Sequence, residues 1–223
     1  MSGMRPLVRA EAHERVLQME TSRGRGAAFT VEWHGREWLV TARHLLPDEA
    51  APEVELNSRH GQHRVRLGFI PSRLAAADIA VALLQEPITP QLSLVPSSDG
   101  VAWSQQVYFL GFPYGMATQL RDDESDRVPF IKQAIVSANV RHSGRHLWFL
   151  DGHNNPGFSG GPVVASTDNF ETMQVIAVVA GNRPADRPVL VADKPLEEVV
   201  VRENTGIVVA TDISHAVELM KVA

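Results

Sequence analysis

The apolar residues of this chain occur in short stretches, each about the length of a β-strand and each bounded by turn-forming residues. Two of them, residues 27–33 and 37–41, flank His34-Gly35, a pair typical of a two-residue hairpin turn. This pattern favours an all-β protein. Further strand-sized segments are residues 64–70, 79–84, 107–111, 133–140, 147–150, 162–165, 175–180 and 206–210.

Helical patterns are confined to the two ends of the chain. Residues 8–19 fit either a helix or a first strand, whereas residues 212–221 fit a helix with Thr211 or Asp212 as its cap. Ten or so strands with little helix favour a barrel or a sandwich. Residues 86–105 contain three prolines and the turn sequence Ser97-Ser-Asp-Gly100, so we expect a linker there between two β units. The charged run 121–127 predicts a solvated loop.

Charge and cysteine content exclude several function classes. The 223 residues include 26 acidic and 21 basic side chains, a net charge of −5, which argues against a dedicated nucleic-acid binder. No cysteine is present, which excludes disulfides, thiol nucleophiles and cysteine-ligated zinc. Charges interrupt the N-terminal segment, and no apolar run approaches the ~20 residues of a membrane span. We therefore expect a soluble, cytoplasmic protein without a membrane partner.

The densest chemical signal is the segment 151–162, in which Gly157, Gly160 and Gly161 surround Ser159. Glycines permit backbone angles closed to other residues and let amides approach a ligand. A serine nucleophile needs a tight turn of this kind, because backbone N–H groups must point to where an oxyanion forms. The alternative interpretation is a glycine-rich turn that carries a surface serine.

A serine hydroxyl needs a base, and His44 has the best context among the nine histidines. It follows the strand-like segment 37–42, so its ring can project from the rim of a barrel. The base in turn needs a carboxylate, and Asp78 lies between two apolar segments, where a charge requires a partner. The remaining histidines are interpreted as surface or structural residues: His13, His34, His60, His63, His142, His146 and His215.

Four segments together resemble the trypsin-like serine peptidases of the chymotrypsin fold, in their cysteine-free, bacterial-type branch. They are Gly26-Ala-Ala-Phe29, Thr41-Ala-Arg-His44, Asp78-Ile-Ala-Val81 and Pro156-Gly-Phe-Ser-Gly-Gly-Pro162. Residues 107–113 are similar to that branch's first strand of the second barrel. The resemblance covers roughly residues 20–215. It implies two antiparallel six-stranded Greek-key barrels with a short C-terminal helix, the first in residues 1–95 and the second in residues 96–223.

The same resemblance implies a role for each residue of a catalytic site. His44 would be the general base and acid, Asp78 its orienting carboxylate and Ser159 the nucleophile. The amides of Gly157 and Ser159 would form an oxyanion hole. Two positions depart from the family. Arg43 stands where a small residue is usual. Phe158 replaces a small or polar residue, so it could narrow the cleft or disturb the turn, and it is expected to contact the substrate.

The resemblance also indicates where a substrate would bind. His153 would lie near the floor of the primary specificity pocket, and Val179, Ala180 and Gly181 would form one wall. Backbone groups of that wall would pair with an extended peptide. No carboxylate occupies the floor position, which argues against cleavage after Lys or Arg and favours a small or medium apolar side chain.

The expected function is therefore a serine endopeptidase that acts on proteins or peptides without a metal or other cofactor. Gly157-Phe-Ser-Gly-Gly161 also matches the turn of α/β-hydrolases, but Gly160-Gly161-Pro162 is a poor helix start. A metal hydrolase has little support, because no H-E-x-x-H segment occurs. Two alternatives remain open: a barrel pair that binds extended peptides without cutting them, and a latent enzyme that needs a regulatory partner.

Overall fold

The computed structural model describes residues 8–74, 77–118, 127–167, 172–192 and 194–223. Strands dominate the fold and the helices are short, so the all-β class expected from the sequence is confirmed. The elements up to residue 83 are α1 (Ala10–His13), β1 (Val16–Thr21), β2 (Gly24–Trp33), β3 (Arg36–Thr41), η1 (Arg43–Leu45), β4 (Glu53–Ser58), β5 (Gly61–Arg66), β6 (Ile70–Pro71) and β7 (Ala80–Leu83). The elements after it are β8 (Val95–Pro96), β9 (Gln106–Gly111), η2 (Pro113–Gly115), β10 (Phe130–His142), β11 (Arg145–Asp151), β12 (Pro162–Ala165), β13 (Gln174–Val191), β14 (Lys194–Asp212) and α2 (Ser214–Val222).

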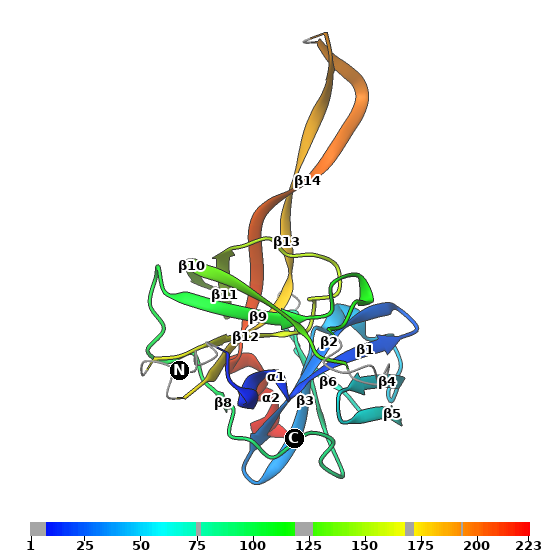
Figure 1. The fold of residues 1–223 in the computed structure, drawn as a ribbon, viewed down its shortest axis with the longest axis vertical. Coiled ribbons are helices and arrows are strands. Elements are labelled where there is room, and N and C mark those ends of the chain that lie inside the picture. Colours follow the sequence, from blue (N-terminus) through cyan, green and yellow to red (C-terminus); the bar gives the residue numbers. More distant parts are fainter. Residues whose placement is uncertain (1–7, 75–76, 119–126, 168–171, 193) are drawn as a thin grey trace, which may run out of the picture.

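The strands form two sheets that divide the chain in order (Figure 1). The first sheet has the order β5-β4-β1-β2-β3-β7-β6, and the second has the order β12-β9-β10-β11-β14-β13-β8. β12 also pairs with β13, so six strands of the second sheet form a closed ring to which β8 is added. The segment expected as a linker, residues 86–105, contains β8, which pairs in parallel with β13.

Three clusters of buried side chains hold the sheets together. One lies within the first sheet around Leu39 and Leu56, and another lies within the second around Phe109 and Phe158. The third contains Phe29 from β2, residues of β9, β12 and β13, and Ile213 beside α2. The two sheets therefore share an apolar interface, and side chains at its rim can come from both sheets.

Hairpin register follows the turn chemistry predicted from the sequence. His34 and Gly35 have φ angles of 50° and 71°, and Trp33 pairs directly with Arg36 across the two-residue turn. Positive φ at both central positions is what a type I′ turn requires, because its twist matches that of the flanking strands. This hairpin fixes the register of β3, the strand that leads to His44.

Several segments differ from the sequence-based expectation. Residues 64–70, expected as one strand, are divided between β5 and β6, and β4 was not expected. The N-terminal segment, which fitted a helix or a strand, contains both α1 and β1. The C-terminal helix is present as α2, and Asp212 Oδ1 accepts a hydrogen bond of 2.8 Å from the Ser214 amide at its start. The charged run 121–127 falls almost wholly outside the described residues.

The largest difference is the hairpin of β13 and β14. Strands were expected only over residues 175–180 and 206–210, but the two strands run on to Val191 and back from Lys194. The added length projects far from both sheets as a two-stranded ribbon (Figure 1). We call its projecting part, residues 183–205, the arm, and its part within the sheet the base. Within the part of the chain that is described, no helix is long and apolar enough to cross a membrane.

Candidate active site

His44 and Asp78 are joined at two points in the first sheet. His44 lies in η1, directly after β3, and Asp78 immediately precedes Ile79 and β7, the neighbour of β3. The Asp78 Oδ2 atom lies 2.6 Å from the His44 Nδ1 atom, and Oδ1 accepts a hydrogen bond of 2.9 Å from the His44 amide. One carboxylate therefore fixes both the backbone and the ring of the histidine. With Nδ1 as the donor, Nε2 carries the lone pair that a general base needs.

Arg43, the unusual residue before this histidine, points toward the segment that carries Asp78. Its Nη1 atom donates a hydrogen bond of 3.1 Å to the carbonyl oxygen of Ser72. The Ser72 amide in turn donates to the carbonyl oxygen of Ile79, 2.9 Å away. Arg43 thus ties η1 to the same short hairpin that holds Asp78, which supports the geometry of the His44–Asp78 pair.

The Ser159 loop has a conformation that requires glycine. Gly157 has a φ of +102°, and a Cβ there would lie 2.1 Å from the carbonyl oxygen of Phe112. Gly160 has a φ of +82°, and a Cβ there would lie 2.1 Å from the carbonyl oxygen of Ala27. Both the backbone angle and the space exclude any side chain. The glycines on either side of Ser159 therefore let this loop pack directly on the backbones of β2 and of the segment after β9.

The packing of this loop brings Ser159 to the first sheet. The Ala27 amide donates a hydrogen bond of 2.7 Å to the carbonyl oxygen of Ser159. A Cβ at Gly160 would lie 3.0 Å from the amide nitrogen of Ala42, two residues before His44. The nucleophile candidate and the His44–Asp78 pair thus meet where the two sheets adjoin. Ser159 Oγ has no hydrogen-bond partner among the described residues, so the structure does not join it to His44 directly.

The backbone amides around Ser159 are divided between those that are bonded and two that are not. The amides of Phe158, Gly160 and Gly161 donate to carbonyl oxygens at distances of 2.8–3.3 Å. Within the described part of the chain, the amides of Gly157 and Ser159 have no acceptor. A pair of free N–H groups beside a serine hydroxyl is the arrangement that stabilises an oxyanion.

Phe158, between these two amides, points into the second sheet. Its side chain is fully buried and makes an edge contact with Phe109, with ring centroids 5.0 Å apart and planes at 69°. From the sequence we expected that this ring could narrow the cleft and that it would contact the substrate. The side chain instead belongs to the core, so only the backbone of Phe158 faces the site.

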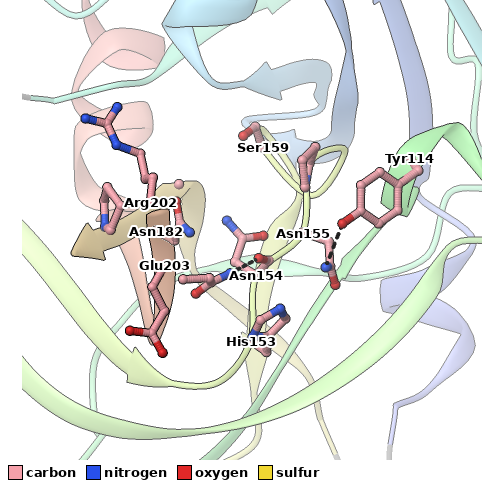
Figure 2. Close-up of a pocket in the computed structure, with 12 residues that line it drawn as sticks. Tyr114, His153, Asn154, Asn155, Ser159, Asn182, Arg202 and Glu203 are labelled. Carbon is pink, nitrogen blue, oxygen red and sulfur yellow. Dashed lines mark hydrogen bonds between the residues drawn. The ribbon is translucent and has the colours of Figure 1, made fainter. Parts of the chain in front are cut away.

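A pocket of about 470 Å³ adjoins Ser159 on the side of the second sheet. His153, which the sequence placed in the specificity pocket, and Gly181 both line it (Figure 2). Polar side chains form much of the wall, among them those of Asn154 and Asn182. A second pocket, of about 590 Å³, is lined by His44 and Asp78. The candidate triad therefore lies between two hollows, one formed by each sheet.

Val179 and Ala180, expected to form a wall of the pocket, do not line it. Val179 is buried, and its N–H and C=O groups bond to Gly161 and Gly160 at 2.9 and 2.8 Å. The free edge of β13 therefore begins one residue later, at Ala180, and continues through Gly181 and Asn182. Asn182 was missed because no strand pattern extends beyond Ala180.

The arm contributes residues to the pocket that the sequence did not indicate. Arg202, Glu203 and Asn204 of β14 line it, together with Pro184 of β13. Asn204 Nδ2 donates to the carbonyl oxygen of Asn154, which connects the root of the arm to the Ser159 loop. No motif surrounds these residues, so a signal for them exists only in the folded chain.

Two of the other histidines contact carboxylates in a way that indicates a structural role. His60 Nε2 lies 2.6 Å from a Glu14 oxygen, and His146 Nδ1 lies 3.1 Å from the buried Asp212 carboxylate. Burial lowers the pKa of His146, although Asp212 opposes the shift, so the neutral ring is favoured. Among the described residues, no group of three or more His, Asp or Glu side chains is arranged to hold a metal ion.

Solved structures share the architecture of this chain. The HtrA-type protease AlgW with a tripeptide has a TM-score of 0.65 and 19% identity, over 95% of this chain and 60% of that one. The active form of the Rv3671c protease from M. tuberculosis has a TM-score of 0.64 and 15% identity, over 97% and 83%. The serine endoprotease from Yersinia pestis has a TM-score of 0.62 and 16% identity, over 95% and 63%. At these identities the likeness shows the fold.

No single curated protein sequence matches the chain significantly, but a model of a protein family does. The chain spans about 60% of the length of the AlgW chain to which it is similar, so the whole of that protein is not represented here. A family model for the trypsin-like peptidase domain matches residues 26–173, which include His44, Asp78 and Ser159. With two thirds of its length matched in this way, the chain belongs to the family of trypsin-like peptidase domains.

Proposed function

We propose that this chain is a serine endopeptidase that cleaves peptide bonds through a Ser159–His44–Asp78 triad and a covalent acyl-enzyme. One observation carries the proposal: Asp78 holds the ring and the backbone of His44 beside a loop in which the amides of Gly157 and Ser159 are free. The triad would join two units, residues 1–95 and 96–223, at their common edge. Active sites are common at such boundaries.

The proposed reaction uses the groups of this site in order. His44 Nε2 accepts the proton of Ser159 Oγ as the oxygen bonds to the peptide carbonyl carbon. The carbonyl oxygen becomes an oxyanion that accepts hydrogen bonds from the amides of Gly157 and Ser159. The imidazolium, stabilised by Asp78, then gives its proton to the leaving amine as the C–N bond breaks. Water, activated by His44, hydrolyses the acyl-enzyme and restores Ser159.

The free edge of β13 favours an extended peptide as the substrate. Ala180, Gly181 and Asn182 follow the last residue that bonds to the Ser159 loop, and beyond them Pro184 has no amide to donate. A substrate strand added to this edge would run past Ser159 with a side chain in the 470 Å³ pocket. The AlgW structure contains a bound tripeptide, which supports peptide binding by this fold.

A fluorophosphonate probe tests the proposal directly, because it reacts with activated serines. We expect labelling of the purified protein that is lost in Ser159→Ala and in His44→Ala. Peptide turnover should fall by a factor on the order of 10⁶ in either variant, as for a triad that acts as a unit. Ser143→Ala, in the turn between β10 and β11, is the matched control and should label normally. Undiminished labelling of Ser159→Ala would contradict the proposal.

A second candidate is a module that binds extended peptides without cutting them. Among the described residues Ser159 Oγ has no hydrogen bond to His44, and a protein that only binds peptides needs none. Catalytic hydrogen bonds are also often long in an enzyme without substrate, so a measurement of labelling has to separate the two functions. This candidate predicts peptide binding by the protein without fluorophosphonate labelling. The same experiment therefore separates the two functions, provided that binding of an unlabelled peptide is measured in parallel.

A further inference from the structure

The Ser159 loop is held along one side by the segment after β9. The Tyr114 amide donates to the carbonyl oxygen of Pro156 at 2.8 Å, and the Phe112 amide donates to that of Gly157 at 3.1 Å. These bonds orient the two peptide groups on either side of the Gly157 Cα atom, the first of which contains the Gly157 N–H. Neither of these hydrogen bonds fixes the start of the loop, residues 153–155. That part must also keep its conformation if the Gly157 amide is to face the site.

The start of the loop is held by Lys132, which comes from β10. Its Nζ atom donates to the carbonyl oxygen of His153 and, at 2.9 Å, to the Oδ1 atom of Asn155. The same ammonium lies 5.6 Å from the centroid of the Phe158 ring, within the range of a cation–π contact. One side chain thus contacts three residues of a six-residue loop.

The contacts of Lys132 continue to the other side of the loop. Asn155 Nδ2 donates a hydrogen bond of 3.3 Å to the hydroxyl of Tyr114, as Figure 2 shows. Tyr114 has a φ of +54°, a strained backbone conformation for a side chain of its size, in the tight turn of η2. A chain of contacts therefore runs from β10 through Asn155 to the segment that fixes Pro156 and Gly157.

Lys132 has no carboxylate partner among the described residues, which is unusual for a half-buried ammonium. Two of its three N–H groups are used on the loop alone. Burial lowers the pKa of Lys132 below that of a lysine in water. Holding the charge there opposes folding at every pH below this pKa, and the cost disappears as the pH rises past the unfolded-state value of about 10.4. Stability alone therefore does not account for this lysine.

We infer that Lys132 is a positioning residue, which holds the loop of residues 153–158 in the shape that directs the Gly157 and Ser159 amides toward the reacting carbonyl oxygen. The inference rests on the proposed peptidase function. It assigns Lys132 no contact with the substrate. Its effect is on the transition state, where the oxyanion exists, rather than on binding of the uncharged carbonyl group.

Lys132→Met tests this role, because methionine keeps most of the apolar stem and removes the donors. For a peptide substrate we expect kcat to fall 10- to 100-fold while KM changes less than threefold. Thermal stability should be unchanged or higher, because the buried charge is gone. Lys132→Arg, which can still donate to both oxygens, should recover most of the lost activity. Lys194→Met, an exposed lysine on the arm, is the matched control and should behave as the wild type.

The pH profile gives a readout that a purely structural lysine would not change. The wild type should lose activity on the alkaline side below the ordinary pKa of lysine, as the ammonium loses its charge. This alkaline limb should be absent in Lys132→Met.

Two further measurements separate failure of this inference from failure of the proposed function. If fluorophosphonate labels Ser159 but Lys132→Met retains the wild-type kcat, the positioning role is wrong and the peptidase stands. Hydrogen exchange of the Phe158 amide, which donates to the carbonyl oxygen of Asn155 at 3.3 Å, does not depend on catalysis. We expect this amide to exchange at least tenfold faster in Lys132→Met, and wild-type exchange there would overturn the inference even in a protein without activity.

Discussion

The base and the arm of the β13–β14 hairpin belong to the same two strands but have opposite environments. In the base, Val179 and Val208 are fully buried within the second sheet. In the arm, Val200 is 60% exposed and Leu190 is 57% exposed, and no further strand of the described residues pairs with either side. Strand pairing alone therefore does not place an element in the core. The difference indicates that the base stabilises the fold, while the arm, which lines the pocket only with residues at its root, depends on the fold for its support.

Charged pairs in the arm fit this interpretation. Arg187 lies 3.0 Å from Glu203 on one face of the ribbon, and Arg202 lies 3.0 Å from Asp186 across the other. All four side chains are about half exposed or more, so solvent screens each pair. A two-stranded ribbon is at best marginally stable by itself in water. The arm is therefore expected to contribute little to the stability of the rest of the chain.

Two valines of the same strand provide the sharpest test, with the largest expected effect. Val208→Ala removes two buried methyl groups and should lower the free energy of unfolding by about 2–3 kcal/mol. Val200→Ala, in the arm, should change it by less than about 0.5 kcal/mol. Urea denaturation of both variants measures the difference. Equal losses of unfolding free energy in the two variants would show that the arm is packed as firmly as the base and would contradict the difference between them.

Asn204 lies where the base meets the arm, and its substitution should have a smaller effect in free energy than Val208→Ala. Its Nδ2 atom donates to the carbonyl oxygen of Asn154, and its Oδ1 atom accepts from the Gly206 amide at 3.1 Å. Asn204→Ala should reduce kcat/KM for a peptide by roughly tenfold, corresponding to about 1.4 kcal/mol, because the pocket wall loses this connection. Asn57→Ala in β4, remote from the pocket, is the control. An unchanged kcat/KM in Asn204→Ala would show that the part of the hairpin needed for activity ends before Asn204, nearer the sheet.

The second sheet around the base should also respond to pH through His146 of β11, which lies beside Asp212 at the end of β14. Burial lowers the pKa of His146, with the Asp212 charge opposing the shift and Arg141 and His215 adding to it. The unfolded chain therefore takes up a proton below about pH 6.5 that the folded chain does not, so stability falls as the pH decreases through this range. His13, whose pKa is also lowered by burial, contributes in the same direction.

Replacing His146 by Gln should reduce that acid-side slope. Chemical denaturation at several pH values between 5 and 8 measures it. His142→Gln, two residues after Val140 at the exposed end of β10, is the matched control and should keep the wild-type slope. A slope that persists in His146→Gln would assign the pH dependence to His13 or to other groups.

The sequence predicted the base better than the arm, for identifiable reasons. Residues 175–180 and 206–210 are apolar runs with β-branched residues, which a buried strand requires. In the arm, Pro184, Pro188 and Pro195 interrupt any alternating pattern, and charges separate the valines. Proline is tolerated there because the arm has two open edges, so a missing donor need not disrupt a ladder. This tolerance of proline follows from the tertiary structure, so it leaves no pattern in the sequence from which the strands of the arm could be predicted.

The candidate site shows the same division. His44, Asp78 and Ser159 each follow or precede a recognisable strand, and the order of the three is specific, so the sequence is enough to predict them as a candidate triad. The direction of the Phe158 side chain and the contacts of Lys132 depend on which elements pack together. Neither residue type signals its role locally: a phenylalanine next to a serine fits a cleft as well as a core, and a lysine on a strand fits solvent.

The smallest expected effect comes from removing the arm, and it is the most direct test of the comparison. Replacing residues 184–203 by a short Asn-Gly turn joins Arg183 to Asn204 and keeps Asn204 with its bond to the Ser159 loop. The exposed apolar side chains of the arm make up no part of the three buried clusters, so the shortened chain should fold with unfolding free energy within about 1 kcal/mol of the wild type. Turnover should stay within about threefold for a short peptide that does not reach the wall formed by Pro184, Arg202 and Glu203, since the free edge at Ala180–Asn182 and the Ser159 loop are retained. A large loss for a folded protein substrate but not for a short peptide would show that the arm contacts the substrate beyond the pocket. A loss of folding would show instead that the base needs the arm, and that the two parts of the hairpin form one cooperative unit.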